Sequence, residues 1–261
     1  MSIMSNFEVV ITDGVATVSF HRPPVNAIDG IAIDELGSIF TSFNENKDVR
    51  VAIFTATGDR AFIAGVDLKN LRTEPSNVSP THLVDAGLAV RRAMWSITDC
   101  AVPVIAAVNG PAIGAGLAFA ACCDMIIASD NATFGATEIN VGLLGASAHL
   151  SSLVGRHKAR EMFFTGELVP AAELYRVGSV RAVVPREQLM EVAMDLARIL
   201  ATKSPLALRM AKSSMNHVEG LTLKEAYRIE QTYTDRLLKF EDSAEARAAF
   251  FEKREPNWKF Q

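Results

Sequence analysis

The sequence predicts an α/β core followed by a helical C-terminal region. Short apolar runs rich in β-branched residues recur up to about residue 185. Segments with helical periodicity separate these runs, which is typical of an α/β fold. From about residue 186 onward the patterns are only helical. We therefore expect two regions, a core over residues 1–195 and a helical region over 196–261.

The first elements are a hairpin, a helix and a buried strand. In FEVVITDGVATVSF, residues 7–20, Asp13-Gly14 is a two-residue turn between two strands. Asp29 is expected to cap a helix that runs to about Asn46, because apolar residues then recur at helical spacing. The apolar run at 49–58 predicts a strand buried on both faces.

The remaining elements follow from the same two patterns. A loop at 59–71, leading into a short helix, and a polar loop at 72–80 are expected after that strand. Ser204-Pro205 is a clear helix start in the C-terminal region. The other predicted strands are 102–110, 124–129 and 180–185, and the other predicted helices are 81–98, 110–123, 186–203, 204–218 and 221–240.

Composition excludes several classes of protein. The chain has 261 residues, 49% of them hydrophobic, so a core needs neither disulfides nor a metal. A net charge of −4 argues against a nucleic-acid partner. The three cysteines, Cys100, Cys122 and Cys123, form no CxxC and predict buried thiols rather than a disulfide or metal site. With no signal-like or membrane-spanning segment, a cytoplasmic protein is expected.

A glycine-rich stretch, GPAIGAGLAFAACCD at 110–124, follows a predicted strand and opens a predicted helix. It is not a dinucleotide fingerprint, because Phe119 stands where the last glycine or alanine is needed. It is not a phosphate-binding P-loop, because no Gly-Lys occurs in the chain. Such a turn exposes backbone N–H groups at a helix start, which suits a developing negative charge. FIAGVDL, residues 62–68, is a second loop of this kind, although close packing also explains the glycines.

Three segments resemble the core motifs of the enoyl-CoA hydratase/isomerase (crotonase) superfamily. They are AFIAGVDLK, PVIAAVNGPAIGAGLAFAACCDMIIAS and ATFGATEINVGLL, and they stand in the family's order. GELVPAAELYRVGSVRAVVP and FFEKREPNW extend the resemblance over essentially the whole chain. The resemblance implies a spiral of β-β-α units with a C-terminal helical trimerisation region.

In that family two backbone amides form an oxyanion hole for the thioester carbonyl of an acyl-CoA. Position by position, these amides fall on Val66 and Ala115. Such donors stabilise an enolate by on the order of 3 kcal/mol each. The family usually has glycine where Ala115 stands, and alanine is compatible if its backbone is helical. The implied substrate is a coenzyme A thioester, with no prosthetic group and no metal.

Family hydratases typically use two glutamates. The position of the first is occupied by Ala118, and the second falls on Glu138. A single glutamate suffices to move a proton from C2 to C4 of a 3-enoyl thioester, the Δ3,Δ2-enoyl-CoA isomerase reaction. We therefore expect isomerase-type chemistry at Glu138, with a capping or surface glutamate as the alternative.

The segment VGLLGASAHLSSLVG is shorter than its counterpart in the hydratases and contains His149. His149 is a candidate second acid–base group, and a capping or packing histidine is the alternative. Ser147 does not stand in a G-x-S-x-G elbow, so a serine hydrolase is not indicated.

The resemblance also implies the residues that contact coenzyme A. Lys69 is a candidate for its phosphates, and Asp67 is a candidate helix cap that orders the oxyanion loop. Lys253, Arg254 and Lys259 are weaker phosphate candidates from the C-terminal end. The complete predicted set for coenzyme A is Val25, Ala27, Ile28, Ala64, Gly65, Val66, Asp67, Leu68 and Lys69.

The family's assembly implies a homotrimer or a dimer of trimers. Two alternatives to the isomerase remain open. One is an enoyl-CoA hydratase in which Glu138 works with a water held by backbone or by His149. The other is a non-catalytic acyl-CoA-binding or RNA-associated protein, although no basic stripe supports RNA binding.

Overall fold

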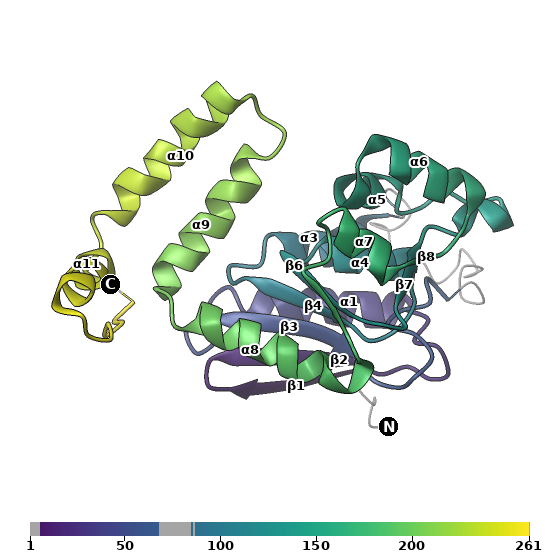
Figure 1. The fold of residues 1–261 in the computed structure, drawn as a ribbon, viewed down its shortest axis with the longest axis horizontal. Coiled ribbons are helices and arrows are strands. Elements are labelled where there is room, and N and C mark those ends of the chain that lie inside the picture. The colour runs from purple at the N-terminus through teal and green to yellow at the C-terminus, as the bar shows by residue number, and fades with distance from the viewer. Residues whose placement is uncertain (1–5, 68–84, 86, 261) are drawn as a thin grey trace.

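The computed structural model describes residues 6–67, 85 and 87–260, and its main feature is a twisted sheet with strand order β1-β2-β3-β4-β6-β9 (Figure 1). Strand β1 pairs antiparallel with β2, and every later pair in this sheet is parallel. The predicted α/β class is confirmed. The strands are β1 (Phe7–Thr12), β2 (Val15–Phe20), β3 (Val51–Ala56), β4 (Val104–Val108), β6 (Met125–Ser129) and β9 (Ala182–Val184).

The predicted hairpin is present. Asp13 and Gly14 both have positive φ, of 50° and 80°, which is the backbone of a type I′ turn. The predicted cap of helix α1 (Gly30–Ser42) is also present, because the Asp29 side chain accepts from the Ala32 N–H. The helix ends at Ser42 rather than near Asn46, since Phe43 is its C-cap and a turn follows.

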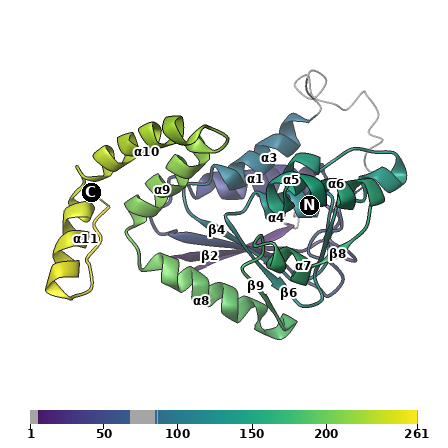
Figure 2. The same ribbon diagram turned by 45° about the horizontal axis from the view of Figure 1, so that its top comes forward.

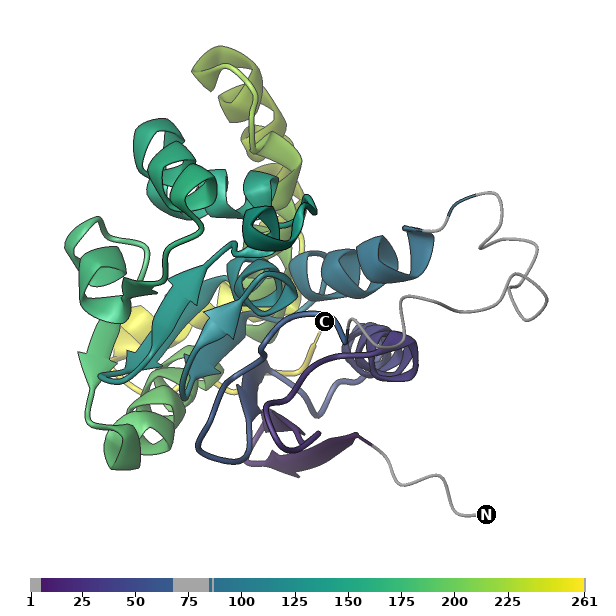
Figure 3. The ribbon, with the colours of Figure 1, turned by 90° about the vertical axis from the view of Figure 1, so that its right-hand side faces the viewer.

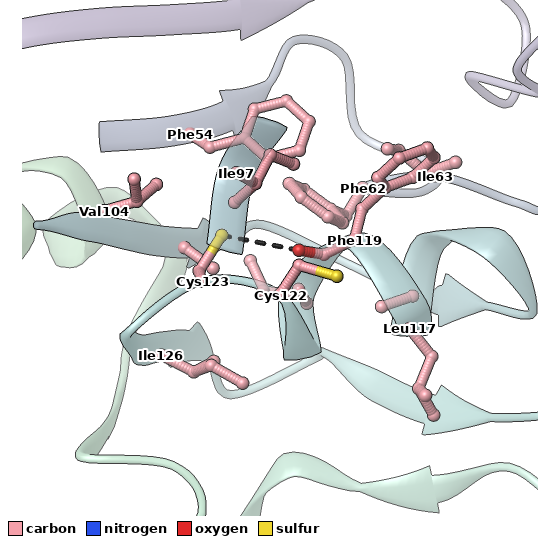
Figure 4. Packing of buried hydrophobic residues seen from close by; sticks show 14 of the residues in the cluster. Phe54, Phe62, Ile63, Ile97, Val104, Leu117, Phe119, Cys122, Cys123 and Ile126 are labelled. Carbon is pink, nitrogen blue, oxygen red and sulfur yellow. Dashed lines mark hydrogen bonds between the residues drawn. The ribbon is translucent and has the colours of Figure 1, made fainter. Parts of the chain in front are cut away.

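Both faces of the central strands are buried, as their continuous apolar runs predict. Along β3, Ala52 and Phe54 point into one core, and Val51 and Ile53 point into the other. Figure 2 shows α1 and α3 (Leu88–Thr98) above the sheet and α8 (Leu189–Ala201) below it. The larger core surrounds α4 (Ala115–Ala121), where Phe119 and Ile97 pack and the Cys123 thiol donates to the Phe119 carbonyl (Figure 4).

The cysteines are free and buried, as predicted. Burial raises the pKa of the Cys122 thiol to about 11, and it also raises the pKa of Cys100 and Cys123. These thiols are therefore protonated and pack as small hydrophobic side chains.

A second sheet, with strand order β5-β7-β8, was not predicted. Its strands have two or three residues each, which is too short for a period-two pattern. The strands are β5 (Ala112–Ile113), β7 (Thr133–Gly135) and β8 (Val169–Pro170). Between β7 and β8 lie η3 (Glu138–Val141), α5 (Ser147–Val154) and α6 (Arg156–Thr165), and α7 (Ala171–Arg176) follows β8.

The helical C-terminal region is present, and Figure 1 shows α9 and α10 projecting from the sheet as an antiparallel pair. Helix α8 spans the expected boundary at residue 195 and packs its Leu189, Ala193 and Leu196 on the sheet. Ser204 caps α9 through the Ala207 N–H, with Pro205 at the first turn, as predicted. After η4 (Arg186–Gln188) and α8, the helices are α9 (Pro205–Val218), α10 (Leu223–Leu237) and α11 (Glu241–Glu252).

Three polar side chains anchor α9 to the core. The Arg209 guanidinium donates to the carbonyls of Phe43, Asn44 and Asn46, which follow the end of α1. Lys212 donates to the Ile97 carbonyl near the end of α3, and Asn216 donates to that of Thr98. These donors bind carbonyls at or just beyond the C-terminal ends of α1 and α3, where the helical hydrogen-bond pattern stops.

Among the described residues, no helix has the length and apolar character needed to cross a membrane.

Candidate active site

Two loops, each following a parallel strand, lie side by side at one edge of the main sheet. The Phe62 N–H donates to the Pro111 carbonyl at 3.0 Å, and the Ile113 N–H donates to the Ile63 carbonyl at 3.0 Å. These bonds align FIAGVD with the glycine-rich stretch predicted from the sequence. Figure 3 views the molecule from the side on which α6, β7 and β8 lie in Figure 1.

Two glycines permit this approach. Gly114 has φ of 55° and ψ of −111°, a conformation that L side chains rarely adopt. A Cβ at Gly116 would lie 2.2 Å from the Ile63 carbonyl oxygen, so any side chain there would push the loops apart. The close-packing interpretation of the glycines is therefore correct for Gly116, and it is compatible with an oxyanion hole.

The predicted oxyanion donors lie on these two loops. In the parallel bridge between Ile28 and Val66, the Ile28 N–H donates to Gly65 and the Asp67 N–H donates to Ile28. The Val66 N–H therefore faces away from that bridge. Ala115 is the first residue of α4, so its N–H has no acceptor within the helix. Within the part of the chain that the structure describes, neither N–H has a backbone acceptor.

The short sheet brings Glu138 to the glycine turn. Strands β5 and β7 pair in parallel, with Ile113 opposite Gly135, so both strands end on the same side of the small sheet. One continues into Gly114 and the other into Glu138. A Cβ at Gly114 would lie 2.5 Å from Glu138 Oε1, and one at Gly145 would lie 2.6 Å from the same oxygen. The carboxylate is thus packed against the residue that precedes Ala115.

The Glu138 carboxylate has an unusual environment. Its Oε2 is buried and has no hydrogen-bond partner among the described residues. A buried polar atom without a partner typically costs about 1–3 kcal/mol. This environment distinguishes Glu138 from a fully solvated surface glutamate and makes it a candidate acid–base group.

Helix α4 provides no second carboxylate. Ala118 is fully buried one turn into the helix, and the sequence from Ala115 to Ala121 has no titratable side chain. Any further acid–base group must therefore come from another element.

His149 lies on the first turn of α5, four residues after Gly145, which packs against Glu138. Its side chain is half-buried, and this burial lowers the pKa of the imidazole below its usual value near 6.5. The ring is therefore neutral at physiological pH.

The residues predicted for coenzyme A are partly described. Val25, Ala27 and Ala64 are half-buried, whereas Ile28 and Gly65 are buried and the Ile28 side chain belongs to the core. Leu68 and Lys69 lie outside the described residues, and so does the helix that Asp67 was expected to cap.

At the C-terminal end, Arg254 pairs with Glu245 and Glu252. Hydrogen bonding to Arg254 lowers the pKa of Glu245 to about 2, and the same pairing raises that of Arg254. Lys253 is the left-handed C-cap of α11, and Lys259 lies 3.8 Å from Glu241. Arg254 is thus already committed to intramolecular partners.

Sequence reasoning missed two residues of this region, Gly145 and Arg22. Arg22 lies in HRPPVNAID and pairs with Asp67, the residue after Val66. No signal in the sequence marks either contact, because each joins segments that only the fold brings together.

Among the described residues no cluster of three or more histidine, cysteine or carboxylate side chains is suited to a metal ion.

Comparison with known families agrees with this architecture. The family model described as enoyl-CoA hydratase/isomerase matches residues 10–261. The chain belongs to the enoyl-CoA hydratase/isomerase family. The predicted membership of the crotonase superfamily and the predicted crotonase fold are confirmed. The expectation of an enzyme that acts on coenzyme A thioesters is supported with them.

Two curated relatives in this family have the same printed name, (7aS)-7a-methyl-1,5-dioxo-2,3,5,6,7,7a-hexahydro-1H-indene-carboxyl-CoA hydrolase. The protein from Rhodococcus jostii is 40% identical, with 94% of this chain and 93% of that protein covered. The protein from Mycobacterium tuberculosis is 42% identical, with 92% of this chain and 96% of that protein covered. A crystal structure of enoyl-CoA hydratase from Bacillus anthracis is 31% identical, with a TM-score of 0.89 over 98% of this chain and all of that one.

Proposed function

We propose that this enoyl-CoA hydratase/isomerase family member forms the enolate of a coenzyme A thioester and uses Glu138 as its single acid–base carboxylate. The N–H groups of Val66 and Ala115 donate to the thioester carbonyl oxygen. The residues predicted for coenzyme A, which are Val25, Ala27, Ile28 and those from Ala64 to Lys69, hold the coenzyme A part of the substrate. No prosthetic group takes part.

The reaction that we favour is Δ3,Δ2-enoyl-CoA isomerisation. Glu138 removes a proton from C2, and the electron pair moves into the carbonyl, forming a dienolate that the two N–H groups stabilise. The protonated Glu138 then returns the proton to C4, and the double bond shifts from C3–C4 to C2–C3. The carboxylate ends as it began, so no second carboxylate is needed.

One observation carries this proposal. The Glu138 carboxylate packs against Gly114 with an unpaired buried oxygen, while α4 provides no other acid or base. One carboxylate and two N–H donors are the minimum set for moving a proton within one thioester.

The two hydrolase relatives favour a second candidate, hydrolysis of a ketone-bearing ring thioester. In a thioester with a ketone at its β-carbon, Glu138 deprotonates a water and the hydroxide adds to the ketone. The Cα–Cβ bond then breaks to give a carboxylic acid and the same thioester enolate. Protonated Glu138 returns its proton to Cα. The support for this candidate is identity of 40–42% over more than nine-tenths of the chain.

Hydration of a 2-enoyl thioester is the third outcome of the same test. It requires a water positioned by backbone or by the neutral His149 in place of the missing carboxylate. The purified protein is offered a 3-enoyl-CoA, a 2-enoyl-CoA and a bicyclic β-keto-acyl-CoA, and the products are separated and weighed. Isomerisation leaves the mass unchanged, whereas hydration and hydrolysis add one water and differ in carbon skeleton.

The matched variants are Glu138→Gln and Glu173→Gln, the second on the exposed surface of α7. We expect Glu138→Gln to lower kcat by about 100- to 10,000-fold, because glutamine cannot exchange the proton. Binding of coenzyme A should be unchanged, and Glu173→Gln should behave as the original protein. An unaltered rate in Glu138→Gln would remove this residue from the chemistry. Binding without turnover of any thioester would favour a non-catalytic protein.

We also propose that residues 196–261 serve assembly into a homotrimer or a dimer of trimers, while residues 1–195 carry the site. Exposed apolar side chains on α9, α10 and α11 support this proposal.

We also propose a cytoplasmic location. The three cysteines of the chain are free thiols, as is usual for proteins of a reducing compartment.

A further inference from the structure

Arg22 connects its own segment, residues 22–29, to Asp67 in the Val66 loop. Its Nη1 donates to the Ala27 carbonyl at 2.6 Å, and its Nη2 lies 3.0 Å from carboxylate oxygens of both Asp29 and Asp67. The Arg22 side chain is 26% exposed, and both carboxylates are less exposed than that. Water therefore screens this ion cluster less than it screens a surface pair.

Two partners of Arg22, Ala27 and Asp67, flank the hydrogen bonds that hold Val66 in place. Ala27 precedes Ile28, whose N–H donates to the Gly65 carbonyl at 2.9 Å. Asp67 follows Val66, and its own N–H donates to the Ile28 carbonyl at 2.8 Å. Arg22 thus ties together the two segments joined by the Ile28–Val66 bridge, from which the Val66 N–H faces outward.

The third partner fixes this unit to a rigid element. Asp29 accepts from Arg22 with Oδ2 and caps α1 with Oδ1, which accepts from the Ala32 N–H at 3.0 Å. The Arg22 guanidinium therefore connects the Val66 loop to the start of α1, a helix of thirteen residues. Only the planar fork of arginine offers this many donors in fixed directions.

We infer that Arg22 is a positioning residue that sets where the Val66 N–H points, acting through Asp67 and the Ile28 bridge. This inference rests on the proposed function, in which that N–H polarises the thioester carbonyl. Stabilisation of an oxyanion depends steeply on donor geometry, so a small displacement of Val66 weakens it without removing the substrate's other contacts.

The test uses Arg22→Met, which retains much of the stem and removes the fork, and Asp67→Asn, which retains the volume and removes the charge. Arg176→Met is the matched control, because Arg176 forms an exposed pair with Glu173 on α7. Each protein is assayed for kcat and KM with the thioester that the wild type turns over. The infrared stretch of a ¹³C-labelled thioester carbonyl is measured in the bound state.

We expect Arg22→Met to lower kcat by about 10- to 100-fold with KM changed far less. The bound carbonyl stretch should move back toward its frequency in water, which a merely structural role would not cause. Asp67→Asn should shift both quantities in the same direction, and it supplies the test if Arg22→Met does not fold. The double variant should be no slower than Arg22→Met alone, because both changes break one interaction.

The outcomes distinguish a failure of the proposed oxyanion hole from a failure of the role assigned to Arg22. If the carbonyl stretch of the wild-type complex equals that in water, the oxyanion hole of the proposed function is wrong. If the wild type shifts the stretch and both variants keep that shift and the wild-type kcat, the oxyanion hole stands and the role of Arg22 is overturned. Arg176→Met should match the wild type in every case.

Discussion

At the scale of single residues, the glycine-rich stretch provides geometry rather than reactive groups. Gly114 leaves room for the Glu138 carboxylate, and Gly116 leaves room for the Ile63 carbonyl. A methyl group at either position would displace a component of the proposed site. From Gly110 to Ala121 the stretch therefore contributes backbone geometry to the proposed site and no ionisable side chain.

A pair of glycine variants tests this interpretation. Gly116→Ala places a Cβ 2.2 Å from the Ile63 oxygen, whereas Gly30→Ala, also at the start of a helix, meets nothing within 4 Å. We expect Gly116→Ala to destabilise the fold by about 1–3 kcal/mol and to lower kcat sharply. Gly30→Ala should leave kcat unchanged and stability equal or up to about 1 kcal/mol higher. Urea denaturation and initial rates measure both, and similar behaviour of the two variants would contradict the argument.

The motifs predicted the candidate site residues more completely than their surroundings. Glu138, Val66 and Ala115 were indicated because their segments resemble the core motifs of the family. The packing of Gly145 against Glu138 and the pairing of Arg22 with Asp67 were not predictable. Both contacts join separate segments, and no local pattern records which segments meet.

At the scale of elements, length decided what could be predicted. Five- and six-residue strands buried on both faces, and helices with a clear cap such as Asp29 or Ser204, were recognisable locally. Strands β5 and β7, with two and three residues, were not, although their pairing brings Glu138 to Gly114. The least predictable elements of the fold are thus the ones that build the candidate site.

Helix α9 offers a test of how the C-terminal region is attached. Lys212 is 5% exposed and donates to Asp124 at 2.7 Å and to the carbonyls of Ile97 and Val102. We expect Lys212→Met to lower the free energy of unfolding by about 2–4 kcal/mol, because it removes three hydrogen bonds and the buried cation that pairs with Asp124.

The matched control is Lys158→Met, which breaks a more exposed pair with Glu161 on α6 and should change stability by less than about 0.5 kcal/mol. Denaturation in urea measures both variants. Equal effects would show that the Lys212 anchor contributes no more than a surface pair.

At the scale of the whole molecule, the C-terminal helices are too apolar for the position they occupy. Helices α9 and α10 project from the sheet and pack on each other (Figure 2), and a groove between them is lined by Met210, Met215 and Leu237. Met215 is 71% exposed, and Phe250 and Phe251 on α11 are 78% and 80% exposed. A projecting pair of helices cannot bury such side chains within its own chain, which supports the proposed assembly.

The expected assembly can be measured and weakened by one substitution. Light scattering coupled to size-exclusion chromatography should give three or six times the 28.2 kDa chain mass. Met215→Glu should shift that mass toward the single chain as the protein is diluted, because a carboxylate would be buried in the interface. Ile31→Glu, at an equally exposed apolar position on α1, should leave the mass unchanged. A single-chain mass for the unaltered protein would show that the apolar faces of α9, α10 and α11 serve another partner.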